Sequence, residues 1–478
     1  MHQKRATRPP LARPSFARPS FALPSFALPV AAVAATVLAL GAVPASASTD
    51  LSDVSLAATS VGAISVGAAP LAATPVAATP TGATSLAATP LAATSVAATP
   101  LAATPTESTP TESTPAGAPP AATCRLPAAV DGLGSGFPVD DQALPAAGTL
   151  KAGLLFVDFE DHPAAVGSLD EAETNLASGV EYLERVSGGR LDVTTTSSDG
   201  WVRMPEPSTS YPFERGLSYE DHVRYIGDAI AAADATFDFS DVDVVWVTAT
   251  KEAPNITYSP TTNFLDVTAD GNHLTHAVTF GYDQWRWGGL VLAHESGHTL
   301  GLPDLYLFEA PPSDPGNWHA AVGGWDLMGL ISGSGPEYFA WHRWQLGWLD
   351  DAQVVCADPR RATTARLGPV AGSGDAPPWQ DTMLVYPISA TRAVVVENRQ
   401  PVGYDEAIST SGALVYTVDT SVRSGEGPVR VVDSTPGSAD GLDDAPFAPG
   451  TSWTEPTTGA VLTFRDGPGS AVGVTVRP

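Results

Sequence analysis

The stretch Leu290-Val-Leu-Ala-His-Glu-Ser-Gly-His-Thr-Leu-Gly-Leu-Pro-Asp304 decides how the chain is organised. Residues four apart lie on one face of an α-helix, so His294 and His298 are expected to direct their rings to one point. That arrangement supplies two ligands of a zinc site. Gly301 permits a sharp turn that brings Asp304 back as a third ligand. Three protein ligands leave a fourth position for water, which is typical of a catalytic zinc site.

Glu295, within the same motif, is the candidate general base. It stands about 100° round the helix from His294, so it can reach a water at the metal without ligating the metal. The alternative is a chance match on a core helix. Met328, in Gly323-Gly-Trp-Asp-Leu-Met-Gly329, favours the metal site, because metzincin-type proteases carry a Met-turn beneath the metal. A lone Met is more often core filler. Together these residues predict a zinc-dependent hydrolase.

The flanking patterns predict a catalytic domain over residues 124–350 and a β-rich C-terminal domain over residues 351–478. Before the motif, strand-like runs alternate with amphipathic helical patterns. The predicted strands are residues 151–158, 190–196, 242–247 and 276–280, and the predicted helices are residues 169–185 and 218–235. After Asp350 the strand-like runs are residues 383–386, 393–397, 412–418, 429–433 and 460–464. The predicted fold class is therefore α/β (α+β), with a Met-turn in the catalytic domain.

The first 123 residues predict two segments outside the folded part. Residues 1–47 have a basic start, an apolar run and Ala-Ser-Ala before a predicted cleavage after Ala47, which is the pattern of a secretory signal peptide. Residues 48–123 form Ala/Thr/Pro-rich five-residue repeats, and Pro interrupts both helix and strand, so a disordered linker is expected. An O-glycosylated stalk and a propeptide are the alternatives. The mature protein is expected to be secreted and extracellular, without membrane insertion.

Charge and cysteine usage agree with export. The chain has 24 Lys and Arg against 52 Asp and Glu, a formal net charge of −28 at pH 7. Such acidity repels nucleic acids and anionic membranes, so neither is expected as a partner. The two cysteines, Cys124 and Cys356, favour a disulfide in an exported protein. Two buried thiols are the alternative.

Residues 294–306, which contain the metal-binding motif, resemble the active-site segment of the secreted immune inhibitor A family of metallopeptidases. Residues 325–328, 341–348, 397–399 and 412–416 also resemble that family, and the resemblance covers roughly residues 151–419. It implies an exported, metzincin-like endopeptidase with one catalytic zinc ion, and it leaves structural calcium open. Leu307 stands where an acid often follows the Leu-Tyr pair in relatives, which weakens a calcium assignment nearby.

The roles of Asp304 and Tyr338 each have an alternative interpretation. Many metzincins have a histidine at the position of Asp304, so Asp304 could instead orient the loop while His319 ligates the metal. We place Asp304 first, because a carboxylate suits zinc. Tyr338 is a candidate hydrogen-bond donor to the oxyanion, with a packing aromatic as the alternative.

The sequence thus predicts a secreted zinc endopeptidase that acts on protein or peptide substrates, with Glu295 as its base. A catalytically inactive, metalloprotease-like cell-surface binding protein is the alternative. The intact Glu295 argues against it, because a binding module has no need of a base beside the ligands. Substrate preference and oligomeric state leave no signal in the sequence.

Overall fold

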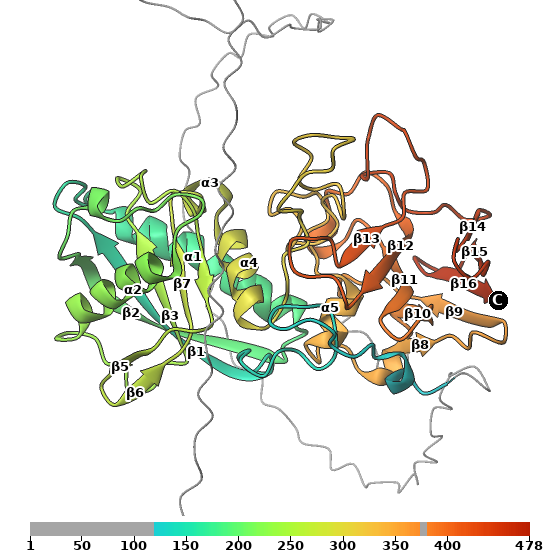
Figure 1. Ribbon diagram of the computed structural model, residues 1–478, viewed down its shortest axis with the longest axis horizontal. Coiled ribbons are helices and arrows are strands. Elements are labelled where there is room, and N and C mark those ends of the chain that lie inside the picture. Colours follow the sequence, from blue (N-terminus) through green and yellow to red (C-terminus); the bar gives the residue numbers. More distant parts are fainter. Residues whose placement is uncertain (1–118, 373–379) are drawn as a thin grey trace, which may run out of the picture. The chain divides into compact units, whose positions relative to one another are not determined.

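The computed structural model describes residues 119–372 and 380–478 (Figure 1). The predicted signal peptide (1–47) and nearly all of the predicted linker (48–123) lie outside the described residues. The helices, with η marking 3₁₀ turns, are η1 (Ala121–Cys124), α1 (Ser168–Val186), η2 (Ser208–Ser210), α2 (Tyr219–Ala233), α3 (Gln284–Trp287), α4 (Gly289–Thr299), α5 (Ala340–Gln345), η3 (Asp351–Gln353) and η4 (Gly403–Asp405).

A five-stranded sheet precedes the metal-binding motif, in the order β2-β1-β3-β7-β4. Its strands are β1 (Gly148–Asp158), β2 (Leu191–Arg203), β3 (Val244–Ala249), β4 (Thr261–Thr262) and β7 (Ala277–Phe280). All of them pair in parallel except β4, which runs antiparallel to β7 at the edge. The four strands and two helices predicted before the motif are therefore confirmed as a mixed α/β arrangement.

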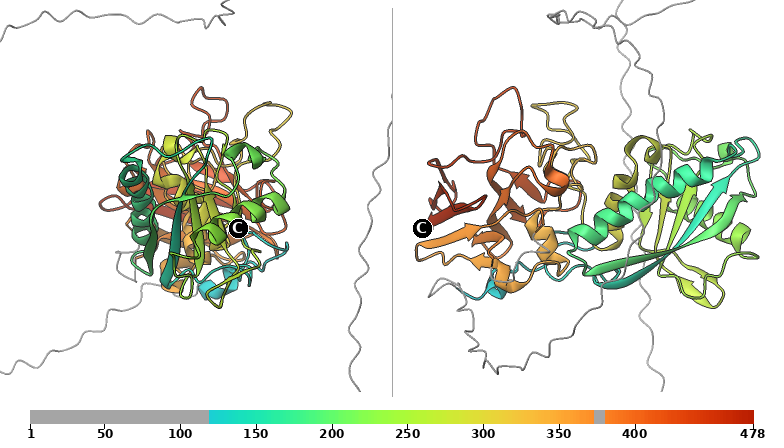
Figure 2. Two further views of the ribbon diagram at one scale, coloured as in Figure 1. Left: turned by 90° about the vertical axis from the view of Figure 1, so that its left-hand side faces the viewer. Right: turned by 180° about the vertical axis from the view of Figure 1, so that it is seen from behind.

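Alternation along β1 decides which helices cover each face of this sheet, because successive strand residues point to opposite faces. Leu154 and Phe156 share a core with α1 and α4. Leu155 and Val157 share a different core with α2. Figure 2 shows α1 lying across one face of the strands. Ser218 caps the start of α2, since its side chain accepts a hydrogen bond from the backbone of Asp221.

The runs predicted as strands after residue 350 are strands, and they form two further sheets. These strands are β8 (Val354–Cys356), β9 (Thr363–Leu367), β10 (Met383–Pro387), β11 (Arg392–Arg399), β12 (Gly412–Asp419), β13 (Val429–Val431), β14 (Ser452–Thr454), β15 (Val461–Asp466) and β16 (Val472–Arg477). One sheet has the order β13-β12-β11-β10-β8 and the other β14-β15-β16-β9. A short hairpin, β5 (Val267–Ala269) with β6 (Asn272–Leu274), completes the strands.

The sheet that contains β11 is buried on both faces. Val395 belongs to the same core as Leu292 and Met328, around the motif helix. Val394 and Val396, on the opposite face, pack against the β14-β15-β16-β9 sheet. The change of pattern near residue 350 therefore lies within one continuous buried core. A division into separate domains at that point stays a prediction.

Cys124 and Cys356 form a disulfide with their Cα atoms 5.7 Å apart, so the predicted pairing is confirmed and the alternative of buried free thiols is wrong. The bond joins η1 to β8 across a sequence separation of 232 residues. Among the described residues, no helix has the length and apolar character needed to cross a membrane.

Candidate metal centre

Every residue of helix α4 except Leu290 is buried, and the helix carries His294, Glu295 and His298. Gly301 follows the helix with φ 100°, in the left-handed region that glycine adopts without strain. The backbone N–H of Gly301 donates to His298 O at 3.1 Å, and that of Leu302 donates to Gly297 O at 2.9 Å. These bonds close the last turn of the helix in the manner of a glycine C-cap. The chain then turns back toward the helix, as the sequence predicted.

The turn brings Asp304 to the two histidines. Asp304 Oδ1 lies 3.4 Å from His294 Nε2 and 3.3 Å from His298 Nε2. Ligand atoms at about 2.0–2.1 Å from a tetrahedral zinc ion are about 3.3–3.4 Å apart, so these spacings match the edges of such a site. Asp304 Oδ1 is also buried and accepts no hydrogen bond. A buried carboxylate oxygen without a donor fits a metal ligand.

The other ring nitrogen of each histidine is held by a backbone carbonyl. His294 Nδ1 lies 2.9 Å from Leu327 O, and His298 Nδ1 lies 2.8 Å from Leu302 O. A carbonyl only accepts, so both Nδ1 atoms carry the proton and donate it. This tautomer leaves both Nε2 lone pairs free for a metal, the usual arrangement of metal-binding histidines. His294, His298 and Asp304 are also the one group of His, Cys, Asp and Glu side chains with metal-site spacing in the described parts of the chain.

The charges in this group favour a cation. Burial lowers the pKa of His298, but the negative charge of Asp304 outweighs burial and raises that pKa to about 9. Burial raises the pKa of Asp304, and the two histidines outweigh burial, so the pKa of its carboxyl is well below its usual range. Asp304 therefore carries a full negative charge at neutral pH, and a divalent cation would take the place of a proton on His298.

Glu295 stands apart from this ligand group. Its side chain is 8% exposed, and Thr261 Oγ1 donates to Glu295 Oε2 at 2.7 Å. Burial raises the pKa of Glu295 above its ordinary value. Thr261 lies on the edge strand β4, and nothing in the sequence pattern linked it to Glu295. The contact forms only because the sheet places β4 beside α4.

A cleft of about 1400 Å³ opens over these residues, and His294, Glu295, His298 and Asp304 all line it. Its lining also includes Arg215 and Tyr306, which the sequence analysis did not single out. Large aromatic side chains at the cleft are about half exposed, namely Tyr219, Phe264, Phe308 and Trp318. The cleft is larger than the roughly 300–1,000 Å³ of ordinary small-molecule pockets.

His319 lines the cleft but lies outside the three-ligand group. Its Nδ1 donates to Gly329 O at 2.7 Å. The structure therefore brings Asp304, and not His319, into ligand spacing with the two motif histidines.

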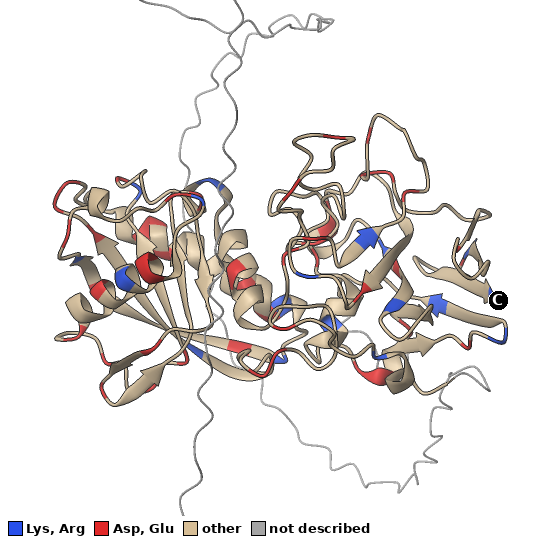
Figure 3. Ribbon diagram, in the orientation of Figure 1, with Lys and Arg blue, Asp and Glu red and all other residues tan. Residues whose placement is uncertain are grey.

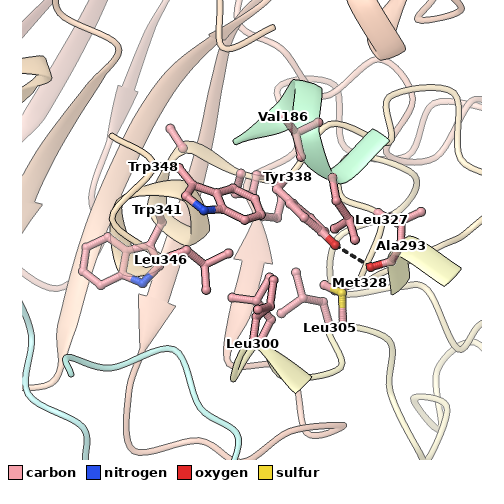
Figure 4. Packing of buried hydrophobic residues seen from close by; sticks show 14 of the residues in the cluster. Val186, Ala293, Leu300, Leu305, Leu327, Met328, Tyr338, Trp341, Leu346 and Trp348 are labelled. Atoms are coloured by element: carbon pink, nitrogen blue, oxygen red, sulfur yellow. Dashed lines mark hydrogen bonds between the residues drawn. The ribbon is translucent and has the colours of Figure 1, made fainter. Parts of the chain in front are cut away.

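Met328 and Tyr338 lie close to Ala293 of α4 in the buried core (Figure 4), and neither lines the cleft. A Cβ atom added at Gly297 would lie 2.7 Å from Met328 Sδ, so the sulfur packs directly against the helix. Tyr338 is fully buried, and its hydroxyl donates to Ala293 O at 2.7 Å. Its single proton is thus used inside the core in this structure, which favours the packing alternative, and the oxyanion role stays a prediction.

The comparisons with known proteins assign no family. No family model matches the chain, and no curated protein matches it. Solved structures that match include metalloproteinase-II from Bacteroides fragilis, at 15% sequence identity and a TM-score of 0.23. That match covers 44% of this chain and 57% of the Bacteroides fragilis protein, so the chain spans little more than half of that protein's length.

Proposed function

We propose that the chain is a secreted, zinc-dependent endopeptidase of the metzincin type, as its motifs resemble the immune inhibitor A family. The observation that carries the proposal is the convergence of His294 Nε2 and His298 Nε2 on the buried Asp304 Oδ1, which accepts no hydrogen bond. Glu295 lies beside these groups in the same cleft without belonging to the ligand set. A base next to an open metal site is the arrangement of a hydrolase.

His294, His298 and Asp304 would hold the zinc ion. When bound, zinc supplies polarisation of the scissile carbonyl and a lowered pKa for water, towards ~7. Glu295 takes the proton of the attacking water and then passes it to the leaving amine. Thr261 holds Glu295 Oε2 at 2.7 Å, which leaves the other carboxylate oxygen for this transfer. Burial raises the pKa of Glu295, so its carboxylate is a stronger base than one in water.

Three further features support the wider proposal. Met328 packs against Gly297 of the motif helix, between the positions of His294 and His298 in sequence, as expected of a Met-turn. The disulfide suits an oxidising compartment outside the cell, as the signal-like sequence also indicates. Acidic residues are spread over loops and helices with fewer basic residues among them (Figure 3), which supports protein or peptide substrates over nucleic acid. Structural calcium gains no support, because the described residues contain no second group with metal-site spacing.

Casein hydrolysis by the purified protein tests the proposal. We expect about one zinc ion per chain, cleavage of casein, loss of cleavage in 1,10-phenanthroline and recovery when zinc is added back. A zinc-loaded protein that cleaves neither casein nor a peptide library would overturn the proposal. That result would favour the inactive binding protein.

A further inference from the structure

A buried charge cluster lies between the metal centre and the C-terminal strands. Its members include Asp326, Glu337, Arg343, Glu397, Arg399 and Asp405, each at most 2% exposed, and Arg343 pairs with Glu337. Removing charges from water costs several kcal/mol per ion unless they are paired and hydrogen-bonded. A cluster of this size is therefore a costly way to fill a core, and its contacts indicate what it does.

Arg399, at the end of β11, is the centre of this cluster. Its Nη2 donates to Trp325 O at 2.6 Å and to Gly335 O at 2.7 Å. Its Nη1 donates to Glu337 O at 3.2 Å and to Glu397 Oε1 at 3.0 Å. A planar guanidinium with five donors can make all these bonds at once. One side chain of the C-terminal sheet thus binds three backbone carbonyls of the segment 325–337.

The same segment orients a metal ligand. The backbone N–H of Met328 donates to Asp326 Oδ1, and that of Phe339 donates to Asp326 Oδ2, each at 2.7 Å. Leu327 lies between Asp326 and Met328, and its backbone carbonyl accepts the proton of His294 Nδ1 at 2.9 Å. The carbonyl bound by Arg399 therefore lies two residues before the carbonyl that sets the orientation and tautomer of His294.

We propose that Arg399 is a positioning residue for the metal centre. It acts through the segment 325–337: by binding the carbonyls of Trp325 and Gly335, it holds Leu327 O where the His294 ring must donate. The sheet that contains β11 is then part of the support of the metal site. This inference rests on one part of the proposed function, namely that His294 binds a metal.

The neighbouring residue offers a matched control. Asn398 is also on β11 and fully buried, but its Nδ2 donates to Leu367 O at 3.1 Å and to Ser470 O at 2.7 Å. These contacts face the other sheet, away from the segment 325–337. Asn398→Ala should therefore lower the melting temperature without altering the metal centre.

The test compares Arg399→Lys with Asn398→Ala in the full chain. Lysine keeps the positive charge beside Glu397 and Asp405, but a single ammonium cannot reproduce the fork to Trp325 O and Gly335 O. We expect zinc affinity, measured by chelator competition, to fall by about 10-fold or more in Arg399→Lys, as for other groups that orient metal ligands. The visible spectrum of Co²⁺ bound in place of zinc should change, and kcat should fall with little change in KM.

Asn398→Ala should keep zinc affinity and the Co²⁺ spectrum while it loses stability. Unchanged zinc affinity and spectrum in Arg399→Lys, or equal losses of affinity in both variants, would contradict a positioning role. If Arg399→Lys does not fold, the double variant Arg399→Gln/Asp405→Asn takes its place, because it removes a cation and a carboxylate together. Its zinc affinity and Co²⁺ spectrum are then compared with those of Asn398→Ala. A chain that binds zinc but cleaves no peptide contradicts the proposed function alone. A chain that binds no zinc contradicts both.

Discussion

Gly179 of α1 lies so close to Gly289 of α4 that a Cβ atom on Gly179 would stand 2.3 Å from Gly289 O. A Cβ atom on Gly289 would in turn stand 2.2 Å from Gly179 N. Side-chain atoms do not approach backbone this closely, so both positions require glycine. The contact occurs at the first residue of α4, and it therefore fixes where the metal-binding helix begins relative to α1 and the sheet.

Gly179→Ala should destabilise the fold by about 1–3 kcal/mol, because α1 must move away from α4 to admit the methyl group. Gly227→Ala in α2 is the control, since a Cβ atom there has nothing within 4 Å. That control should be neutral or stabilising by up to about 1 kcal/mol, because alanine favours helix. Urea unfolding measures both. Equal stability of the two variants would show that α1 and α4 do not approach as described.

Asp304→Ala should reduce zinc affinity, because it removes one of three protein ligands and leaves two. Activity should recover in part when excess zinc is added. His319→Ala is the comparison, since His319 lines the cleft but lies outside the ligand group. Metal content after dialysis separates the two variants. If Asp304→Ala still binds zinc tightly and His319→Ala loses its zinc, then His319 is the third ligand.

Glu295→Gln should keep zinc and lose turnover by about 10²–10⁴-fold, since glutamine retains the shape of the side chain but cannot accept a proton from water. The hydrogen bond from Thr261 can persist to the amide oxygen. Zinc content and kcat are measured on the same sample. Turnover within a few-fold of the unchanged protein would exclude Glu295 as the base, whereas zinc loss would make it a ligand.

Much of the metal centre was predictable because its residues are close in sequence. Helical periodicity places His294 and His298 on one face, and Gly301 marks the turn to Asp304. Thr261 and Arg399 were not predictable as parts of the site, because sheet pairing and core packing bring them there from distant segments. Arg399 was noticed only as part of a resemblance.

Tyr338 shows a different limit of sequence reasoning. Its position after Met328 was compatible with a place at the cleft or in the core, and the sequence does not distinguish these two places. In the structure, the Tyr338 ring packs in the buried core against Tyr182, with ring centroids 5.5 Å apart. The strands after residue 350 were predictable from their β-rich runs. The sequence did not predict that one face of these strands completes the core of the metal centre. Strands buried on both faces show no alternation of apolar and polar residues, so the pattern does not indicate what packs on each face.

His222 gives a prediction on stability and pH. It is 5% exposed in α2, its Nε2 lies 3.1 Å from Thr279 Oγ1, and burial lowers its pKa to about 4. The unfolded chain therefore binds a proton on this histidine below about pH 6.5, and the folded chain does not until about pH 4. The contribution of His222 to the free energy of unfolding is therefore fully present above about pH 6.5. As the pH falls from about 6.5 to about 4, up to about 3 kcal/mol of it is lost.

His222→Gln removes the titrating group but can keep a hydrogen bond to Thr279. We expect its free energy of unfolding, from urea titrations at pH 4–7, to fall less steeply below pH 6.5 than that of the unchanged protein. Thr279→Val is the control: it removes the partner and leaves the histidine, so it should lower stability across the range without removing the acid-side slope. The same slope in His222→Gln and in the unchanged protein would mean that His222 is not held neutral in the folded state, and the acid sensitivity would have to come from other groups.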